Sequence, residues 1–284
     1  MFGTAPSDIS SPRFVDAHVH LTRPEAIHDL ARAGIIAARD AGTKQGSGLT
    51  LQRSSGAGSP LRIITAGRAL SKRGGYGAFL GIQVETRQEI VSEILKLKAE
   101  GTDIIKIITS GVVSFEHPGM VTAGGFERDD VRFIVNEAGR HGLDVMAHAN
   151  GEEMIRIAAE AGVRSIEHGF FMTEAALRSL GEHNVYWVPT VGALRRAVER
   201  SDVGHEVIQF VDRMIYEHLA LVRKAFEWGI PLAVGTDAVL PDRRYRSIYE
   251  AELRYFIQAG IPRDAVLAIA CEGGKKLLEI NTVD

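Results

Sequence analysis

The stretch "GRHGLDVMAHANG", residues 139–151, contains one complete copy of the pattern that decides the fold. It begins in the polar tail of a predicted helix and then reaches Gly142, a residue suited to the left-handed conformation that often ends helices. The apolar run that follows has the composition of a buried strand, and His148 lies near its end. The stretch therefore predicts the end of a helix, a tight turn and a strand whose last residues are polar.

Further stretches along the chain repeat this order of features. They are "ARAGIIAARDAG" (31–42), "KAEGTDIIKIITSG" (98–111), "AEAGVRSIEHGFF" (159–171), "GEHNVYWVPTVG" (181–192) and "FEWGIPLAVGTDA" (226–238). Amphipathic helices are predicted between them, for example over residues 86–100 and 127–141, and a last helix over residues 262–280. Strands predicted at residues 13–20 and 61–67 bring the total to eight strands, each followed by a helix or loop.

Alternating strands and helices predict an α/β protein with a parallel sheet. Eight such units favour a (β/α)8 TIM barrel over an open, doubly wound sheet. The open sheet stays as the alternative, although the glycine-rich phosphate loop that usually follows its first strand is missing. The Gly/Ser-rich stretch at residues 43–60 predicts a loop with a weak helix rather than a domain boundary. We therefore expect one barrel domain over residues 1–284.

Composition narrows the possible partners of the chain. Lys and Arg number 33 and Asp and Glu number 36, so no basic surplus indicates binding to nucleic acid or to an anionic membrane. No apolar run is long enough for a transmembrane helix, and the first residues lack the pattern of a signal peptide. The lone cysteine, Cys271, excludes an intrachain disulfide framework. We expect a cytoplasmic protein that acts on a small molecule.

Polar residues at the predicted strand ends form the candidate site. Catalytic groups of a (β/α)8 barrel lie at the carboxyl ends of its strands. Taken singly, a strand histidine, an aspartate before a helix or a lysine near a strand end is ordinary. Together, four imidazoles, a carboxylate and an amine on one rim need an organising partner, which a divalent metal ion supplies. The six residues are His18, His20, Lys106, His148, His168 and Asp237.

Five motifs give the sequence a resemblance to a known family. They are "DAHVH" (16–20), "DIIKI" (103–107), "VMAHANG" (145–151), "SIEHG" (165–169) and "VGTDA" (234–238). This pattern resembles the amidohydrolase superfamily, and within it the imidazolonepropionase-like and prolidase-type hydrolases. The resemblance extends from residue 13 to residue 280.

The resemblance implies a binuclear metal centre, with zinc, manganese or iron as the metal. His18, His20 and Asp237 would hold the first ion, and His148 and His168 the second. Lys106 would be carbamylated by carbon dioxide and would bridge the two ions. Elementary chemistry supports this last step, because a buried lysine has a depressed pKa and therefore a nucleophilic free amine.

The same resemblance implies a reaction. A metal-bound hydroxide would attack a carbonyl carbon, and Asp237 would pass the proton to the leaving group. The expected substrate is an amide, such as an N-acyl amino acid, a dipeptide or a lactam. Alternatives within the superfamily are a one-metal deaminase and a lactonase or phosphotriesterase-like hydrolase. An alternative of another class is a catalytically silent barrel that acts as a scaffold.

Two further expectations come from departures from the usual pattern of relatives. Relatives usually carry a small β-sandwich built from both chain ends, and here it is expected to be absent, which makes a homo-oligomer plausible. Candidate substrate contacts lie in the loops that follow the strands. These are Tyr76 in "GRALSKRGGYGAF" (67–79), His117 in "SGVVSFEHPGM" (110–120), Asn150 after His148, and Arg243 in "LPDRRYRSIYE" (240–250).

Overall fold

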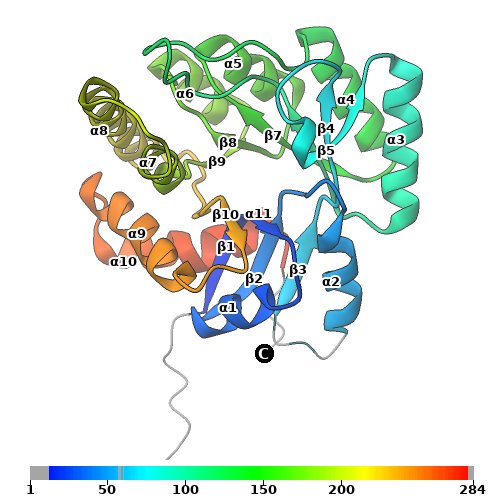
Figure 1. The fold of residues 1–284 in the computed structure, drawn as a ribbon, viewed down its shortest axis with the longest axis horizontal. Helices are drawn as coiled ribbons and strands as arrows, with labels where there is room; N and C mark the ends of the chain where they lie inside the picture. Colours follow the sequence, from blue (N-terminus) through cyan, green and yellow to red (C-terminus); the bar gives the residue numbers. More distant parts are fainter. Residues whose placement is uncertain (1–12, 57–58, 60, 281–284) are drawn as a thin grey trace, which may run out of the picture.

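A computed structural model of the chain describes residues 13–56, 59 and 61–280. Parallel strands lie at the centre of the molecule and helices cover them from outside (Figure 1). The predicted (β/α)8 barrel is confirmed. Its strand positions are β1 (Phe14–Leu21), β2 (Ile35–Asp40), β3 (Arg62–Thr65), β6 (Ile104–Ile108), β7 (Asp144–Ala149), β8 (Ser165–His168), β9 (Tyr186–Val188) and the extended segment 231–237. The first twelve residues, for which no signal peptide is predicted, and both ends of the predicted domain lie outside the described residues.

Two seams join the strands into a closed ring. The ladders form two sheets, one in the order β10-β1-β2-β3 and the other in the order β5-β4-β6-β7-β8-β9. At the first seam the backbone N–H of Asp103, just before β6, donates to the carbonyl of Thr65 in β3 at 2.9 Å. At the second, the segment 231–237 lies between β9 and β1, because Trp187 N donates to Pro231 O at 2.9 Å and Ala17 N donates to Val234 O at 2.8 Å.

The predicted last strand differs in one detail from the structure. The sequence predicts that this strand ends at Asp237, and the segment 231–237 does occupy the eighth position of the barrel. The chain then continues as a short strand, β10 (Ala238–Leu240), in which Ala238 pairs with Val19 of β1. This added pairing holds Asp237 between two segments that are both bonded to the first strand.

The helices follow the strands as predicted. The structure contains α3 (Arg87–Glu100) and α4 (Arg128–Arg140), within one residue of the predicted bounds. Thr86 begins α3 with a capping box, in which its side chain accepts from Glu89 N and Glu89 accepts from Thr86 N. The other helices are α1 (Ala26–Arg32), α2 (Ser47–Ser55), α5 (Glu152–Ala161), α6 (Glu174–Glu182), α7 (Val191–Glu199), α8 (His205–Glu227) and α9 (Tyr245–Gln258). Within the described residues, no helix is both long enough and apolar enough to cross a bilayer.

The left-handed residues that mark each repeat lie where the pattern predicts them. Each has a positive φ between the end of one helix and the start of the next strand. They are Gly34 (78°), Gly101 (89°), Gly142 (65°), Gly162 (86°), Asn184 (52°) and Gly229 (69°). The repeat therefore reflects a local backbone requirement that recurs once per unit of the barrel.

Two segments differ from their predictions. Residues 67–79, predicted as a loop, contain strand β4 (Ala69–Lys72), which pairs with β6 and with β5 (Gly81–Val84). A Cβ on Gly81 would lie 2.2 Å from Ala69 O, so this close pairing depends on glycine. The predicted helix at 262–280 is divided into α10 (Arg263–Ala268), a π-helical turn at Ile269–Gly273 and α11 (Gly274–Leu277).

The last helices close the ring next to its first strand. Figure 1 shows α9, α10 and α11 beside β1 and β10, so the two ends of the described chain meet. Gly274 packs so closely against β1 that a Cβ there would lie 2.5 Å from Val15 Cβ. Within the described ranges the strands belong to the barrel or extend its sheets, and no β-sandwich is present.

Candidate active site

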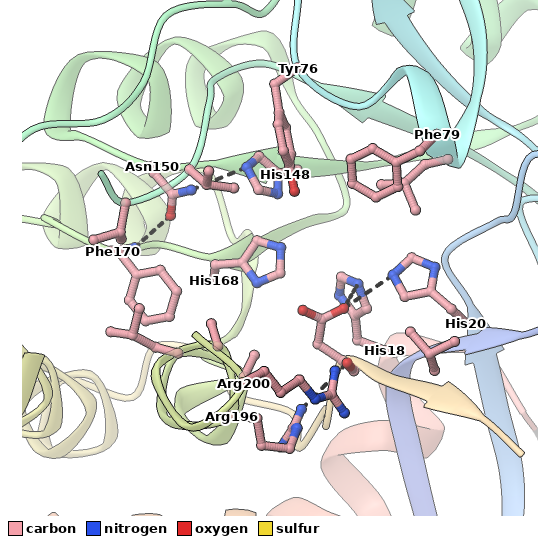
Figure 2. A pocket seen from close by; sticks show the side chains of 18 of the residues that line it. His18, His20, Tyr76, Phe79, His148, Asn150, His168, Phe170, Arg196 and Arg200 are labelled. Carbon is pink, nitrogen blue, oxygen red and sulfur yellow. Dashed lines mark hydrogen bonds and ion pairs between the residues drawn. The ribbon is translucent and has the colours of Figure 1, made fainter. Parts of the chain in front are cut away.

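A cavity of about 440 Å³ opens at the carboxyl ends of the barrel strands. All six residues predicted for the rim line this cavity, together with aromatic and aliphatic side chains from the surrounding loops (Figure 2). They come from five positions of the ring: His18 and His20 from β1, Lys106 from β6, His148 from β7, His168 from β8 and Asp237 from the end of the segment 231–237. The fold therefore brings together residues separated by more than two hundred positions.

His18, His20 and Asp237 form the tightest group. One ligand atom of each lies within 4.8 Å of the others. The Asp237 Oδ1 atom is 3.4 Å from His18 Nε2 and 3.1 Å from His20 Nε2. The backbone N–H of Asp237 also donates to the carbonyl of His18 at 2.7 Å, and Asp237 has the uncommon φ of 51° for a residue other than glycine. Two imidazoles and a carboxylate in this arrangement suit a divalent cation such as Zn²⁺.

His148 and His168 lie beside that group. Their ring centroids are 4.5 Å apart, and the ring of His168 lies 5.2 Å from that of His18. Figure 2 shows the four imidazoles around the same space. His168 has φ of 68°, so, like Asp237, it is presented to the cavity from a strained backbone.

Each imidazole uses one nitrogen to bond the surrounding protein. His20 Nδ1 faces Gly42 O at 2.6 Å, and His148 Nε2 faces Gly111 O at 2.9 Å. A carbonyl oxygen only accepts, so these nitrogens carry the protons and the opposite nitrogens are left with lone pairs. His168 Nδ1 lies 2.7 Å from Thr190 Oγ1, and His18 Nδ1 lies 2.6 Å from Glu167. Such outer partners are typical of histidines that bind metals.

Burial keeps three of the imidazoles neutral at physiological pH. Burial, with Lys106 next in effect, lowers the pKa of His18 to about 4 and that of His148 to about 3. Burial and the neighbouring His148 hold the pKa of His168 well below its usual value. For His20, burial is the largest single influence and would lower the pKa, but the hydrogen bond and charge of Asp237, together with Gly42 and Asp40, raise the pKa above its usual value. A cation at the His20–Asp237 pair would therefore compete with a proton.

Lys106 has an environment that does not suit an ammonium group. Its side chain is 1 % exposed, and within the described part of the chain its Nζ has no hydrogen-bond partner. Burial lowers the pKa of Lys106 to about 8, although the negative charges of Glu167 and Asp237 act to raise it. An orphaned buried amine of depressed pKa fits a lysine that becomes carbamylated and ligates metal, so the residues present fit the metal centre implied by the sequence.

An ion pair that the sequence analysis missed lies beneath the histidines. Glu167 accepts from Arg39 Nη2 at 2.8 Å, and both side chains have 0 % exposure. Arg39 also donates from Nε to Ala17 O at 2.7 Å, in the strand that carries His18. Burial would raise the pKa of Glu167, but Arg39 and His18 outweigh it and lower the pKa to about 2. The sequence does contain one sign of this ion pair. A charged residue stands inside each of two apolar predicted strands, Arg39 in "IIAARD" and Glu167 in "SIEH", and the two charges are opposite.

Two of the four candidate substrate contacts lie in the cavity. The Tyr76 ring is 5.4 Å from that of His148, and burial raises the Tyr76 pKa to about 12, so its hydroxyl stays a donor. Asn150 also lines the cavity, but its amide is engaged by the protein: Nδ2 donates to Gly111 O at 3.0 Å and Oδ1 accepts from Phe170 N at 3.0 Å. Asn150 therefore joins the loops that follow β6 and β8.

The structure does not bring the other two candidate contacts, His117 and Arg243, into the cavity. His117 is exposed on the outer part of its loop, and Arg243 lines a different surface depression beside α1. Arg243 lies outside the cavity because the neighbouring Tyr245 is the residue of this segment that points into the core. Its hydroxyl donates to Asp16 Oδ2 at 2.8 Å in the core, which leaves Arg243 outside.

The arginines that do line the cavity are Arg196 of α7 and Arg200, the residue that caps the carboxyl end of α7. Neither arginine is among the site residues predicted from the sequence. The two arginines are four residues apart in the segment that follows β9, so they lie on one helical face. This spacing was the sign in the sequence that both could face the site.

The chain is similar in sequence to a known family and to known proteins. Residues 9–283 match the model of the Amidohydrolase family. An ochratoxinase of Aspergillus niger is 26% identical over 202 residues, which cover 67% of this chain and 41% of the relative. An uncharacterized protein of Mycobacterium tuberculosis is 24% identical over 247 residues, which cover 80% of this chain and 63% of the relative. The matched part thus spans well under half of the length of the ochratoxinase.

Solved structures show the same barrel. A Xaa-Pro dipeptidase with bound methionine in the active site superposes with a TM-score of 0.77 at 25% identity, covering 95% of this chain and 75% of that one. The A. niger ochratoxinase superposes with a TM-score of 0.79 at 20% identity, covering 94% and 71%. Both are larger than the chain described here.

Proposed function

Because the chain belongs to the amidohydrolase family, we propose that it is a metal-dependent hydrolase of carbon–nitrogen bonds. The proposed substrates are amides such as an N-acyl amino acid, a dipeptide or a lactam. One observation carries the proposal: the buried, partnerless Lys106 lies in the same cavity as four imidazoles and Asp237. The names of the ochratoxinase and dipeptidase relatives also support amide hydrolysis.

The proposed centre holds two divalent cations, zinc, manganese or iron. His18, His20 and Asp237 would hold one ion, His148 and His168 the other, and a carbamylated Lys106 would lie between them. When bound, the cations would supply an acidified water and would polarise the substrate carbonyl. The outer hydrogen bonds of the imidazoles support this assignment, because they leave a lone pair on the nitrogen opposite each fixed proton.

The side chains of this chain would then manage the proton. Burial would raise the pKa of Asp237, but the His20 hydrogen bond and nearby imidazoles outweigh burial and hold the pKa well below its usual value. Asp237 is therefore ionised at the start of the reaction and would accept the proton of the attacking water, then donate it to the leaving amine. Tyr76, which stays protonated, would donate a hydrogen bond to the substrate or to the developing oxyanion.

A second candidate is a one-metal deaminase, and a specific observation favours it. Only His18, His20 and Asp237 bring their ligand atoms within 4.8 Å of one another among the described residues. Deaminases of this superfamily commonly use a glutamate shortly after this histidine as the proton shuttle. Here Glu152 and Glu153, the acidic residues that follow His148 most closely, begin α5 and do not line the cavity, which argues against a deaminase. A lactonase or phosphotriesterase-like activity would use the same groups on another electrophile.

Metal content and substrate scope test the proposal together. Purified protein should hold about two divalent ions per chain by elemental analysis. Zinc- or manganese-loaded protein should release amine from at least one member of a panel of N-acyl amino acids, dipeptides and lactams. One ion per chain with ammonia release from amino-heterocycles would favour the deaminase. No bound metal and no turnover would favour the silent scaffold.

A further inference from the structure

The charged groups around the cavity are unequal in sign. Among the described residues that line it, Asp237 carries the one carboxylate side chain, whereas Arg196 and Arg200 carry guanidinium groups. Cations held by the imidazoles would add further positive charge. The field in the cavity therefore favours a substrate that carries a negative charge.

Helix α7 and its C-cap residue supply the two arginines from one face. Ala193, Arg196, Ala197 and Arg200 follow the i, i+3, i+4, i+7 spacing of a single helical face, and all four line the cavity. The two alanines leave space between the helix and the cavity. Figure 2 shows Arg196 and Arg200 on one side of the site and Tyr76 and Phe79 on the other.

The two arginines differ in what they bind. Arg196 Nη2 donates to the carbonyl of Thr236 and lies 3.4 Å from the carbonyl of Asp237, so it holds the segment that presents Asp237. The guanidinium of Arg200 has no hydrogen-bond or ion-pair partner among the described residues. Asp242, a carboxylate on which the charge of Arg200 acts, is itself paired with Arg244 at 3.2 Å. Of these two arginines, Arg200 is therefore the one whose guanidinium can bind a ligand.

We propose that Arg200 is the residue that selects the substrate, by binding a carboxylate on the leaving amine. This inference rests on the proposed function and narrows its substrates to amides of α-amino acids. The leaving nitrogen takes its proton from Asp237, and Arg196 ties Asp237 to the helix that carries Arg200 one turn further on. The α-carboxylate of the leaving amino acid is one carbon from the leaving nitrogen, so it would lie on the side of the cavity where Arg200 is found. The Arg200 guanidinium would bind this carboxylate through two parallel hydrogen bonds.

The opposite wall indicates the nature of the acyl group. Tyr76 and Phe79 pack edge to face with ring centroids 5.4 Å apart. Phe79 is 58 % exposed, although it lines the cavity. Exposed apolar side chains at the edge of a cavity are suited to contact with an apolar ligand. The inferred substrate is therefore an α-amino acid with a free carboxylate and an aromatic or aliphatic N-acyl group.

The test compares two substrates that differ only in the carboxylate. They are N-benzoyl-leucine and N-benzoyl-3-methylbutylamine, assayed with metal-loaded enzyme. Arg200→Gln should lower kcat/KM for N-benzoyl-leucine about 10- to 100-fold more than for the analogue, because a charge-assisted pair is lost for only one of them. The matched control is Arg195→Gln, on the same helix, whose guanidinium pairs with Asp212 and which should leave both values unchanged. Arg243→Gln is a second control.

Equal effects of Arg200→Gln on the two substrates, or no effect on either, would overturn the inference. Failure of the wild-type enzyme to hydrolyse both compounds would count against the proposed function instead. In that case, calorimetry with the two ketomethylene analogues, with and without the carboxylate, still decides the role of Arg200. Binding of the carboxylate form should be about 10- to 100-fold tighter, and this preference should disappear in Arg200→Gln. A preference that is missing from the wild type, or that Arg200→Gln retains, would overturn it.

Discussion

The Nδ1 atom of His18 lies 2.6 Å from Oε2 of Glu167, although the two residues are 149 positions apart and lie on strands β1 and β8. The other carboxylate oxygen of Glu167 accepts from Arg39. A carboxylate facing Nδ1 keeps the proton there, so the Nε2 lone pair of His18 points to Asp237 and the cavity. This buried chain of three residues therefore orients a histidine that the proposed function assigns to metal binding.

Glu167→Gln should weaken metal binding. An amide has one oxygen, so the NH₂ group must face either Arg39 or His18, and in the second case the His18 proton moves to the nitrogen that faces the cavity. We expect metal affinity to fall about 10- to 100-fold, measured by competition with a chelator. Loss of the buried charge partner of Arg39 should also cost about 3–5 kcal/mol of unfolding free energy.

Arg39→Met separates these two effects. It removes the buried partner of Glu167 but keeps the hydrogen bond to His18, so stability should fall while metal affinity stays near the wild-type value. The double variant should lose less stability than the sum of the single variants, because no buried charge is left without its partner. Wild-type metal affinity in Glu167→Gln would contradict the orienting role.

Lys106→Ala should lose the metal pair. Two divalent cations a few ångströms apart repel strongly unless an anion lies between them, and Asp237 is assigned to one ion. Metal content by elemental analysis should fall, and short carboxylic acids in the buffer should restore part of it by occupying the vacated space. Wild-type apo protein should regain activity faster with bicarbonate. Lys72→Ala, which removes a surface pair with Glu127, is the control. Full metal content in Lys106→Ala would exclude the bridging role.

Asp237→Asn should reduce kcat far more than it weakens binding of a substrate-like inhibitor. An amide oxygen can still contact a cation, but it cannot accept a proton. The expected loss in kcat is about 10²- to 10⁴-fold. Steady-state kinetics and inhibitor titration provide the measurement, and Asp242→Asn, a carboxylate outside the cavity, is the control. A loss confined to KM would show that Asp237 positions the substrate instead.

Stability should depend on pH through Glu252. Burial raises the pKa of this carboxyl to about 7, although Gly192 N, Val191 N and Arg196 favour its charged form. Between pH 4.5 and 7 the folded state keeps a proton that the unfolded state releases, so this contribution is present below pH 4.5 and lost as pH rises through 7. Relative to Glu252→Gln, the wild type should lose about 3 kcal/mol of unfolding free energy over this range in urea titrations. Parallel profiles of the two proteins would contradict this assignment.

The sequence by itself determined the barrel and the set of residues on its rim. A left-handed residue, an apolar run and a polar end are local features, and their recurrence requires parallel strands whose carboxyl ends meet. His18, His148 and Asp237 could therefore be placed together without coordinates. The helix at 87–100 was also predictable, because its capping box is encoded within four residues. The assigned roles of the rim residues stay proposals that the variants above test.

Only the tertiary structure decided which charged residues face one another. The Arg39–Glu167–His18 chain depends on side chains from three strands meeting inside the ring, and no periodicity within one strand specifies partners on another. The choice between Arg200 and Arg243 likewise depended on long-range packing. The hydroxyl of Tyr245 bonds Asp16 in the core and leaves Arg243 outside, whereas the packing of α7 beside the cavity places Arg200, its C-cap residue, among the lining residues.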